Sequence, residues 1–324
     1  MRIPGIKTAR TFSRWLQARV LGGALILGYH RVANVSLDQD KACVTPKHFA
    51  EQLEVLSKYA YPIRLCELVQ QLKEGSLQPR SVAVTFDDGY ADNLYQAKPI
   101  LEKYAIPATI FICTGYAGKE FWWDELESLV MLSQAELSAL CLEARGIRFV
   151  WEQSKERPET DVDVRMKFHR ALYNFLLTLD VEEQNHAMNT IRTWSGVSSG
   201  KAIARAMTHD ELMQIVDDGL IEIGAHTLHH PMLPQLSIGR QREEIISSKQ
   251  DLEALLDRRV DGFAYPNGRA TDDAKRILRE AGFVFACTSL HDVVRPASDL
   301  YELTRFWQRD VDGDRFLQGL KAWM

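Results

Sequence analysis

The fold of this chain is decided by the segment Ala83-Val84-Thr85-Phe86-Asp87-Asp88-Gly89-Tyr90. The apolar, β-branched run that ends at Phe86 is typical of a buried strand, and a helical periodicity begins at about Ala91. Asp-Gly is also the commonest hairpin signal, but a hairpin needs a second strand, and the following residues have no strand periodicity. Two adjacent carboxylates at the end of a buried strand repel each other unless a cation or a proton relieves them. The segment therefore predicts a functional site.

Strand-helix units repeat on both sides of this segment. We expect further strands at 24–30, 106–115, 220–225, 262–265, 283–288 and 301–306, and helices at 46–56, 66–72, 91–104, 237–256, 271–281 and 312–323, with one more that Thr208 caps. Buried strands that alternate with helices imply a parallel sheet, and about seven units suggest a closed or nearly closed barrel.

The rhythm changes between about residues 119 and 206, where the sequence is charged and mostly helical. Helices are expected at 161–179 and 181–194, with one strand at 147–151. We interpret this stretch as a helical insertion in the barrel. Trp122 and Trp123, near its start, could form a wall on which sugars stack or could anchor the insertion to the barrel.

The composition is that of an ordinary globular protein. The 324 residues are 46% hydrophobic and 26% charged, and the net charge of -5 argues against nucleic acid as a partner. The five cysteines have no CxxC spacing, so they indicate reduced thiols and neither a disulfide scaffold nor a zinc ribbon.

The N-terminus is basic and leads into an apolar run. Residues 1–23 contain five Lys and Arg residues before any acid, a pattern that resembles the start of a signal peptide. The apolar run from Val20 to Tyr29 is too short to span a bilayer, and no small-residue cleavage site precedes it. We therefore expect a basic N-terminal helix over 1–23 that could touch a membrane surface, in a cytoplasmic protein.

A second polar cluster is Gly224-Ala225-His226-Thr227-Leu228-His229-His230-Pro231. It also follows an apolar strand, and in a parallel barrel the ends of both strands lie on the same rim. Histidines four residues apart share one face if the chain turns once, so the pair can hold one cation. A single histidine of the cluster could instead cap a strand or pack. We expect His229, between the other two, to point elsewhere.

These two clusters together resemble the first two motifs of the polysaccharide deacetylases, the family 4 carbohydrate esterases. Two further segments, Gly28-Tyr29-His30-Arg31-Val32 and Phe263-Ala264-Tyr265-Pro266-Asn267-Gly268, are similar to signatures of one branch of that family. The resemblance implies an α/β fold, a distorted (β/α)7-type barrel over residues 24–324, interrupted by the insertion at about 119–206.

The resemblance also implies a divalent metal, Zn²⁺, with Asp88, His226 and His230 as ligands and Asp87 as general base. A carboxylate and two neutral imidazoles leave open positions on zinc for water and a substrate carbonyl. The backbone N–H of Tyr90 could face the oxyanion that forms when water attacks.

The sequence departs from the family pattern at two roles. Many members have Arg at the position of Ala264 to orient the base; here Arg305 is the natural substitute, unless it is an ordinary surface arginine. For the general acid, His291 in Ser289-Leu290-His291-Asp292 has the family's Leu-x-His form but comes early in the chain. His30, at the end of the first strand, is the other candidate.

The function that the resemblance implies is hydrolysis of a carbon–nitrogen bond other than a peptide bond. The expected enzyme is a metal-dependent deacetylase that removes N-acetyl groups from a glycan or glycolipid precursor. Two alternatives use the same site, a sugar deformylase and an O-acetyl esterase. A third is a non-catalytic carbohydrate-binding barrel.

Overall fold

The computed structural model describes residues 23–39, 41–144, 146–151, 160–197, 204–216 and 219–323. The helix expected over 1–23 lies outside this range apart from residue 23, so that helix and its membrane contact stay predictions. None of the described helices combines the length and the apolar sequence that crossing a bilayer requires.

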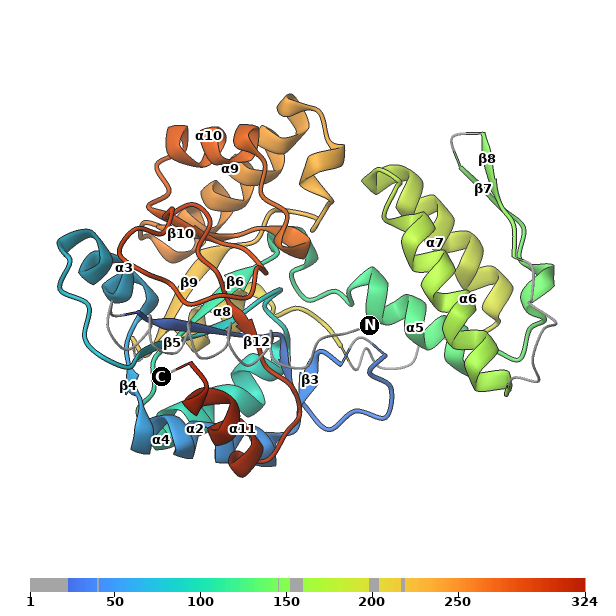
Figure 1. Ribbon diagram of the computed structural model, residues 1–324. Helices are drawn as coiled ribbons and strands as arrows, with labels where there is room; N and C mark the ends of the chain where they lie inside the picture. Colours follow the sequence, from blue (N-terminus) through green and yellow to red (C-terminus); the bar gives the residue numbers. More distant parts are fainter. Residues whose placement is uncertain are drawn as a thin grey trace, which may run out of the picture.

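A curled sheet of eight parallel strands forms the centre of the fold (Figure 1). Its order is β11-β10-β9-β6-β5-β1-β12, and β4 pairs with the start of β5. The strands are β1 (Leu25–Tyr29), β4 (Tyr61–Pro62), β5 (Ser81–Phe86), β6 (Ala108–Ile112), β9 (Ile221–Ala225), β10 (Gly262–Ala264), β11 (Phe285–Cys287) and β12 (Phe306–Trp307). Among the described residues, β11 and β12 are not paired, and an isolated bridge joins Cys287 of β11 to Leu303, which precedes β12. The α/β fold with a distorted, incompletely closed barrel is therefore confirmed.

Helices surround the curled sheet and pack on its outer face, in one continuous apolar core. In Figure 1, α2, α4 and α11 lie on one side of the strands, and α9 and α10 lie on the other. The helices around the sheet are α2 (Pro46–Tyr59), α3 (Leu65–Glu74), α4 (Lys98–Tyr104), α8 (His209–Ile215), α9 (Ile238–Leu256), α10 (Asp272–Glu280) and α11 (Gly313–Lys321). The start of α8 is as predicted from the sequence, because Thr208 and Glu211 form the expected capping box.

The insertion (residues 119–206) stands beside the barrel and has an apolar core of its own (Figure 1). It contains α5 (Trp122–Leu132), α6 (Asp161–Leu176) and α7 (Val181–Ser195), with a small antiparallel pair, β7 (Leu142–Ala144) and β8 (Ile147–Phe149). Trp122 is buried in this core and stacks on Tyr173 at a ring-centroid distance of 5.2 Å. Trp122 therefore anchors the insertion and forms no sugar-stacking wall.

Two predicted elements differ from the structure. The strand expected at 301–306 is reduced to β12, because residues 299–302 form a turn in which the Glu302 N–H donates to the Asp299 carbonyl (2.9 Å). The helix expected from residue 91 contains a π-helical segment, Asn93–Ala97, before α4. Pro99 explains this register, because it has no N–H to donate to the carbonyl of Tyr95.

Candidate active site

The paired carboxylates lie in a sharp turn at the end of β5. Asp88 has φ 71° and Gly89 has φ 84°, which puts both in the left-handed region. This conformation is uncommon for a residue with a side chain and marks a turn that its surroundings hold in place. The neighbouring strands supply that support: the Asp87 N–H donates to the Tyr29 carbonyl (3.0 Å), and the Cys113 N–H donates to the Asp88 carbonyl (3.2 Å).

The histidine cluster lies in a second strained turn, after β9. Thr227 has φ 66° and His230 has φ 56°. The Thr227 hydroxyl accepts the N–H of His230 (3.0 Å) and donates to the carbonyl of His226 (2.5 Å). His226 and His230 thus point to the same side of this turn. The turn is formed by the buried Thr227 and two residues in the left-handed region, and it is not helical.

Glu244 on α9 stabilises this turn, a role that no sequence motif indicates. One of its carboxylate oxygens accepts the N–H groups of Leu228 and His229, each at 3.0 Å. The other lies 2.8 Å from the His229 Nδ1. His229 therefore points away from the other two histidines, as expected.

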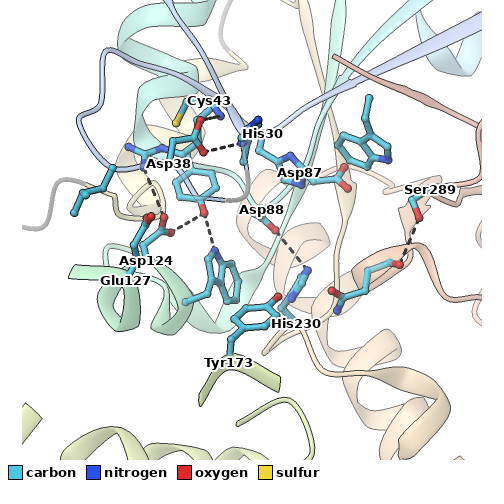
Figure 2. Close-up of a pocket in the computed structure, with 18 of the residues that line it drawn as sticks. His30, Asp38, Cys43, Asp87, Asp88, Asp124, Glu127, Tyr173, His230 and Ser289 are labelled. Atoms are coloured by element: carbon cyan, nitrogen blue, oxygen red, sulfur yellow. Dashed lines mark hydrogen bonds and ion pairs between the residues drawn. The ribbon is translucent and has the colours of Figure 1, made fainter. Parts of the chain in front are cut away.

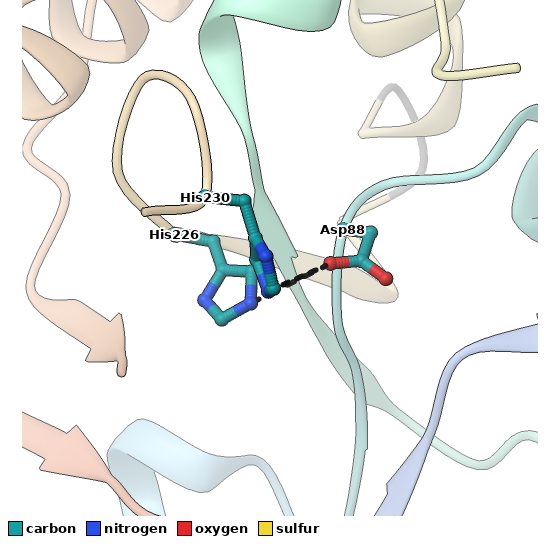
Figure 3. Close-up of side chains that lie close together, drawn as sticks. All are labelled: Asp88, His226 and His230. Carbon is teal, nitrogen blue, oxygen red and sulfur yellow. Dashed lines mark ion pairs between the residues drawn. The ribbon is translucent and has the colours of Figure 1, made fainter. Parts of the chain in front are cut away.

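Asp88, His226 and His230 form the group that could hold a metal ion (Figure 3). The Asp88 Oδ1 lies 3.5 Å from the His226 Nε2 and 3.7 Å from the His230 Nε2. Two ligand atoms of a tetrahedral zinc ion with bonds of ~2 Å are about 3.3 Å apart, close to this spacing. The Asp88 Oδ1 is buried and accepts no hydrogen bond from a described residue. A buried carboxylate oxygen of this kind needs a cation or a proton, and with two imidazole nitrogens beside it the group fits a divalent metal.

The protonation states also suit a metal. Burial lowers the pKa of His226, and burial together with the charge of His226 lowers the pKa of His230 well below its usual range. Both rings are therefore neutral at pH 7, the form that binds metals. The His226 Nδ1 lies 2.7 Å from the Ala264 carbonyl and donates its proton there, which leaves Nε2 to bind a cation. Burial, followed by the charges of Asp87 and Asp124, raises the pKa of Asp88 well above its usual range, a repulsion that a cation would relieve.

Arg305 holds Asp87 through two hydrogen bonds. Its Nη1 and Nη2 atoms donate to the two carboxylate oxygens at 2.6 and 2.7 Å, and its Nε donates to the Thr288 carbonyl at 3.0 Å. The Arg305 side chain is fully buried, so the surface-arginine alternative is wrong. Burial alone would raise the pKa of Asp87, but the charges of Arg305 and then His226 bring it to about 2. Asp87 is therefore ionised at neutral pH.

The two histidines considered as general acids lie in different places. His30 lines the pocket, with its ring stacked on Trp307 at 4.5 Å and 14° (Figure 2). Gly28 makes this stack possible, since a Cβ at that position would lie 2.8 Å from the Trp307 ring.

His291 is not brought to the site, which corrects its assignment as a candidate. Its exposed ring packs edge-on against Phe306, at a centroid distance of 4.1 Å. Along β12, Phe306 points to the opposite face from Arg305 and Trp307. His291 therefore lies on the outer side of the barrel, away from Asp87.

Tyr90 is part of the site through both its backbone N–H and its side-chain hydroxyl. Its backbone N–H donates no hydrogen bond to a described residue, so it is available to an oxyanion. Its buried hydroxyl donates to an Asp124 oxygen at 2.7 Å and accepts the Trp123 indole N–H at 2.8 Å.

The two aspartates, His30, Tyr90 and the two metal-binding histidines line a pocket of about 490 Å³ (Figure 2). The barrel supplies both aspartates, His30, His226, His230 and Trp307. The insertion supplies a second wall, made of Trp123, Asp124, Glu127, Arg170 and Tyr173. The pocket has the volume of a small-molecule or oligosaccharide site.

Comparison with known proteins identifies the class to which this fold and site belong. The family model described as Polysaccharide deacetylase matches residues 74–137 and 170–286, so the chain belongs to that family. The family predicted from the motifs is thereby confirmed.

Among curated relatives, the poly-beta-1,6-N-acetyl-D-glucosamine N-deacetylase of Staphylococcus aureus is 34% identical over 131 residues, 36% of this chain and 43% of the relative. The protein of the same name from Staphylococcus epidermidis is 31% identical over 130 residues. The match thus spans less than half the length of these relatives.

Two solved structures share the fold. The Streptococcus pyogenes deacetylase PplD has a TM-score of 0.61 and 20% identity, covering 92% of this chain and 98% of its own. IcaB from Ammonifex degensii has a TM-score of 0.60 and 21% identity, covering 93% and 97%.

Proposed function

We propose that this chain is a metal-dependent hydrolase that removes N-acetyl groups from a glycan or a sugar-containing precursor. The observation that carries the proposal is the pairing of Asp87 with Arg305 directly beside the Asp88, His226 and His230 group. A base that is ionised and held in one orientation, next to three metal-binding side chains, suits the attack of water on an amide carbonyl. The names of the curated relatives support an N-acetylated amino sugar as substrate.

The roles of the residues follow from their positions. A divalent cation held by Asp88, His226 and His230, most simply Zn²⁺, would supply Lewis acidity for the water and the substrate carbonyl. Asp87 takes a proton from the attacking water, and Arg305 keeps its carboxylate turned toward the pocket. The backbone N–H of Tyr90 faces the oxyanion. When the carbon–nitrogen bond breaks, acetate leaves and the amine takes up a proton.

His30 is the donor of that proton in this proposal. It lies at the end of β1 on the wall of the pocket that Asp87 and His230 also line. Stacking on Trp307 fixes the plane of its ring.

The test is metal content together with acetate release from β-1,6-linked N-acetylglucosamine oligomers, for the wild type and Asp87→Asn. We expect bound metal and acetate release in the wild type, and bound metal without acetate release in the variant. A wild-type protein without metal, and with no difference from the variant, would refute the hydrolase and favour a carbohydrate-binding barrel. Release of formate from N-formyl sugars or of acetate from O-acetyl esters, with N-acetyl sugars inert, would point to a deformylase or an O-acetyl esterase.

A further inference from the structure

The C-terminal end of the insertion lies against the residues that follow Asp87 and Asp88, and its N-terminal end pairs with that C-terminal end. Met207 donates its N–H to the Gly89 carbonyl, and Ala91 donates its N–H to the Arg205 carbonyl, both at 2.9 Å. Glu120 and Arg205 form an antiparallel bridge, and so do Tyr90 and Ala206. The insertion is thus joined by backbone hydrogen bonds to the residues that follow the metal-binding carboxylate.

Trp123 extends this connection to the other half of the metal-binding group. Its indole N–H donates to the Tyr90 hydroxyl at 2.8 Å, two residues from Asp88. Its ring also contacts the His230 imidazole, at a centroid distance of 4.8 Å and an angle of 48°. One side chain of the insertion therefore touches both turns, the one after β5 and the one after β9.

Asp124 and Arg31 stabilise the contact between Trp123 and Tyr90. The Asp124 carboxylate accepts the Tyr90 hydroxyl at 2.7 Å and lies 3.7 Å from an Arg31 nitrogen. Arg31 also donates to Asp92 at 2.9 Å, and its guanidinium lies over the Tyr90 ring at 4.9 Å. The Tyr90 hydroxyl thus has both a donor and an acceptor partner, which fixes its direction and that of the Trp123 ring.

We propose, on the basis of the proposed metal-dependent function, that Trp123 is a positioning residue of the metal site. It holds the His230 ring toward Asp88, and the Tyr90–Asp124 hydrogen bond fixes Trp123 in turn. The insertion, beyond forming a pocket wall, thereby sets the affinity and geometry of the bound metal. Residues that orient metal ligands commonly change metal affinity by about 10–100-fold when they are replaced.

The adjacent tryptophan provides a matched control. Trp122 has the same side chain and the same helix, but it is buried against Tyr173 in the core of the insertion. Replacing Trp122 tests the effect of a loosened insertion, whereas replacing Trp123 also removes the contact with His230. Tyr90→Phe removes both hydrogen bonds of the hydroxyl and keeps the ring and the backbone N–H.

The experiment measures the Kd for Zn²⁺ by competition with a chromophoric chelator, and the visible spectrum of the Co²⁺-loaded protein, whose d–d bands depend on ligand geometry. We expect Trp123→Ala to raise the Kd at least about tenfold and to shift the Co²⁺ bands. Tyr90→Phe should change both in the same direction, and Trp122→Ala should match the wild type.

Two results would overturn the proposal. One is unchanged metal affinity in both Trp123→Ala and Tyr90→Phe, and the other is an equal loss of affinity in Trp122→Ala and Trp123→Ala. If Trp123→Ala does not fold, the result for Tyr90→Phe decides.

A wild-type protein that binds no metal would instead refute the proposed function. If the wild type binds metal and releases acetate, the proposed function stands, and the variants then test the role of Trp123 alone.

Discussion

Arg305 and Asp87, which are 218 residues apart in the sequence, form a fully buried pair in which two guanidinium nitrogens contact the two carboxylate oxygens at 2.6 and 2.7 Å. Removing one partner of such a pair leaves the other charge buried without compensation, which typically costs about 3–5 kcal/mol. The pair therefore determines both the stability and the reactivity of this rim of the barrel.

Arg305→Met is expected to lower the free energy of unfolding by about 3–5 kcal/mol, because it leaves the Asp87 carboxylate buried and unpaired. Urea denaturation measures this change. In the double variant with Asp87→Asn the buried charge is absent as well, so part of the lost stability should return. Strictly additive losses in the double variant would contradict the inferred coupling.

His226→Ala is expected to lose metal and activity together, because it removes one of three ligand atoms. Asp87→Asn should keep the metal and lose activity, because Asp87 is assigned to proton transfer. Metal analysis after dialysis, alongside acetate release, distinguishes the two. Equal loss of metal in both variants would show that the division of roles between Asp87 and Asp88 is wrong.

His30→Gln is expected to lower kcat by about 100-fold or more, the usual effect of losing a general acid. His291→Gln is its control, because that ring packs on Phe306 outside the barrel and should leave kcat unchanged. The measurement is kcat for acetate release at saturating substrate. A loss of kcat in His291→Gln with normal turnover in His30→Gln would reverse the assignment.

Asp124 is expected to make the stability of the metal-free protein depend on pH. Burial raises the pKa of its carboxyl to about 7, although Arg31 lowers it, whereas an aspartate in an unfolded chain titrates near about 3.9. Between these values the folded protein binds more protons than the unfolded chain, so this group lowers the free energy of unfolding as pH rises through the window. The change ends once pH exceeds the folded pKa and is on the order of a few kcal/mol.

Urea denaturation of the chelator-treated protein, compared with Asp124→Asn across that pH range, measures this contribution. The stability of the wild type relative to the variant should decrease as pH rises. Parallel pH profiles for the two proteins would mean that Asp124 titrates in the folded state as it does in the unfolded chain.

The sequence was most informative where chemistry coincides with a strand end. The Asp87-Asp88 pair and the His226-His230 pair each follow an apolar strand, and the parallel topology then puts both on one rim. Arg305 was predicted as a partner for Asp87 because the family's arginine is absent at Ala264, and it lies immediately before β12.

Contacts between distant elements were beyond reach of local patterns. His291 matches a family motif, yet the short β12 turns Phe306, and with it His291, to the outer face. In the sequence, Glu244 is indistinguishable from any exposed glutamate of a helix. Only the packing of α9 shows that it accepts hydrogen bonds from the turn after β9. Trp122 and Trp123 are indistinguishable in the sequence, and only the direction of α5 sends one into the insertion core and the other to His230.

The hydrogen bonds between the insertion and residues 89–91 limit how this protein can be re-engineered. An insertion whose ends merely met at the barrel surface could be shortened, exchanged or transplanted as a cassette. Here residues 205–207 form the boundary of the module and also bond to the residues after the carboxylate turn, and residues 119–120 pair with them. An insertion transferred to another barrel must therefore include these junction residues. Substitutions or changes of length in the insertion can leave the carboxylate turn intact only outside the junction.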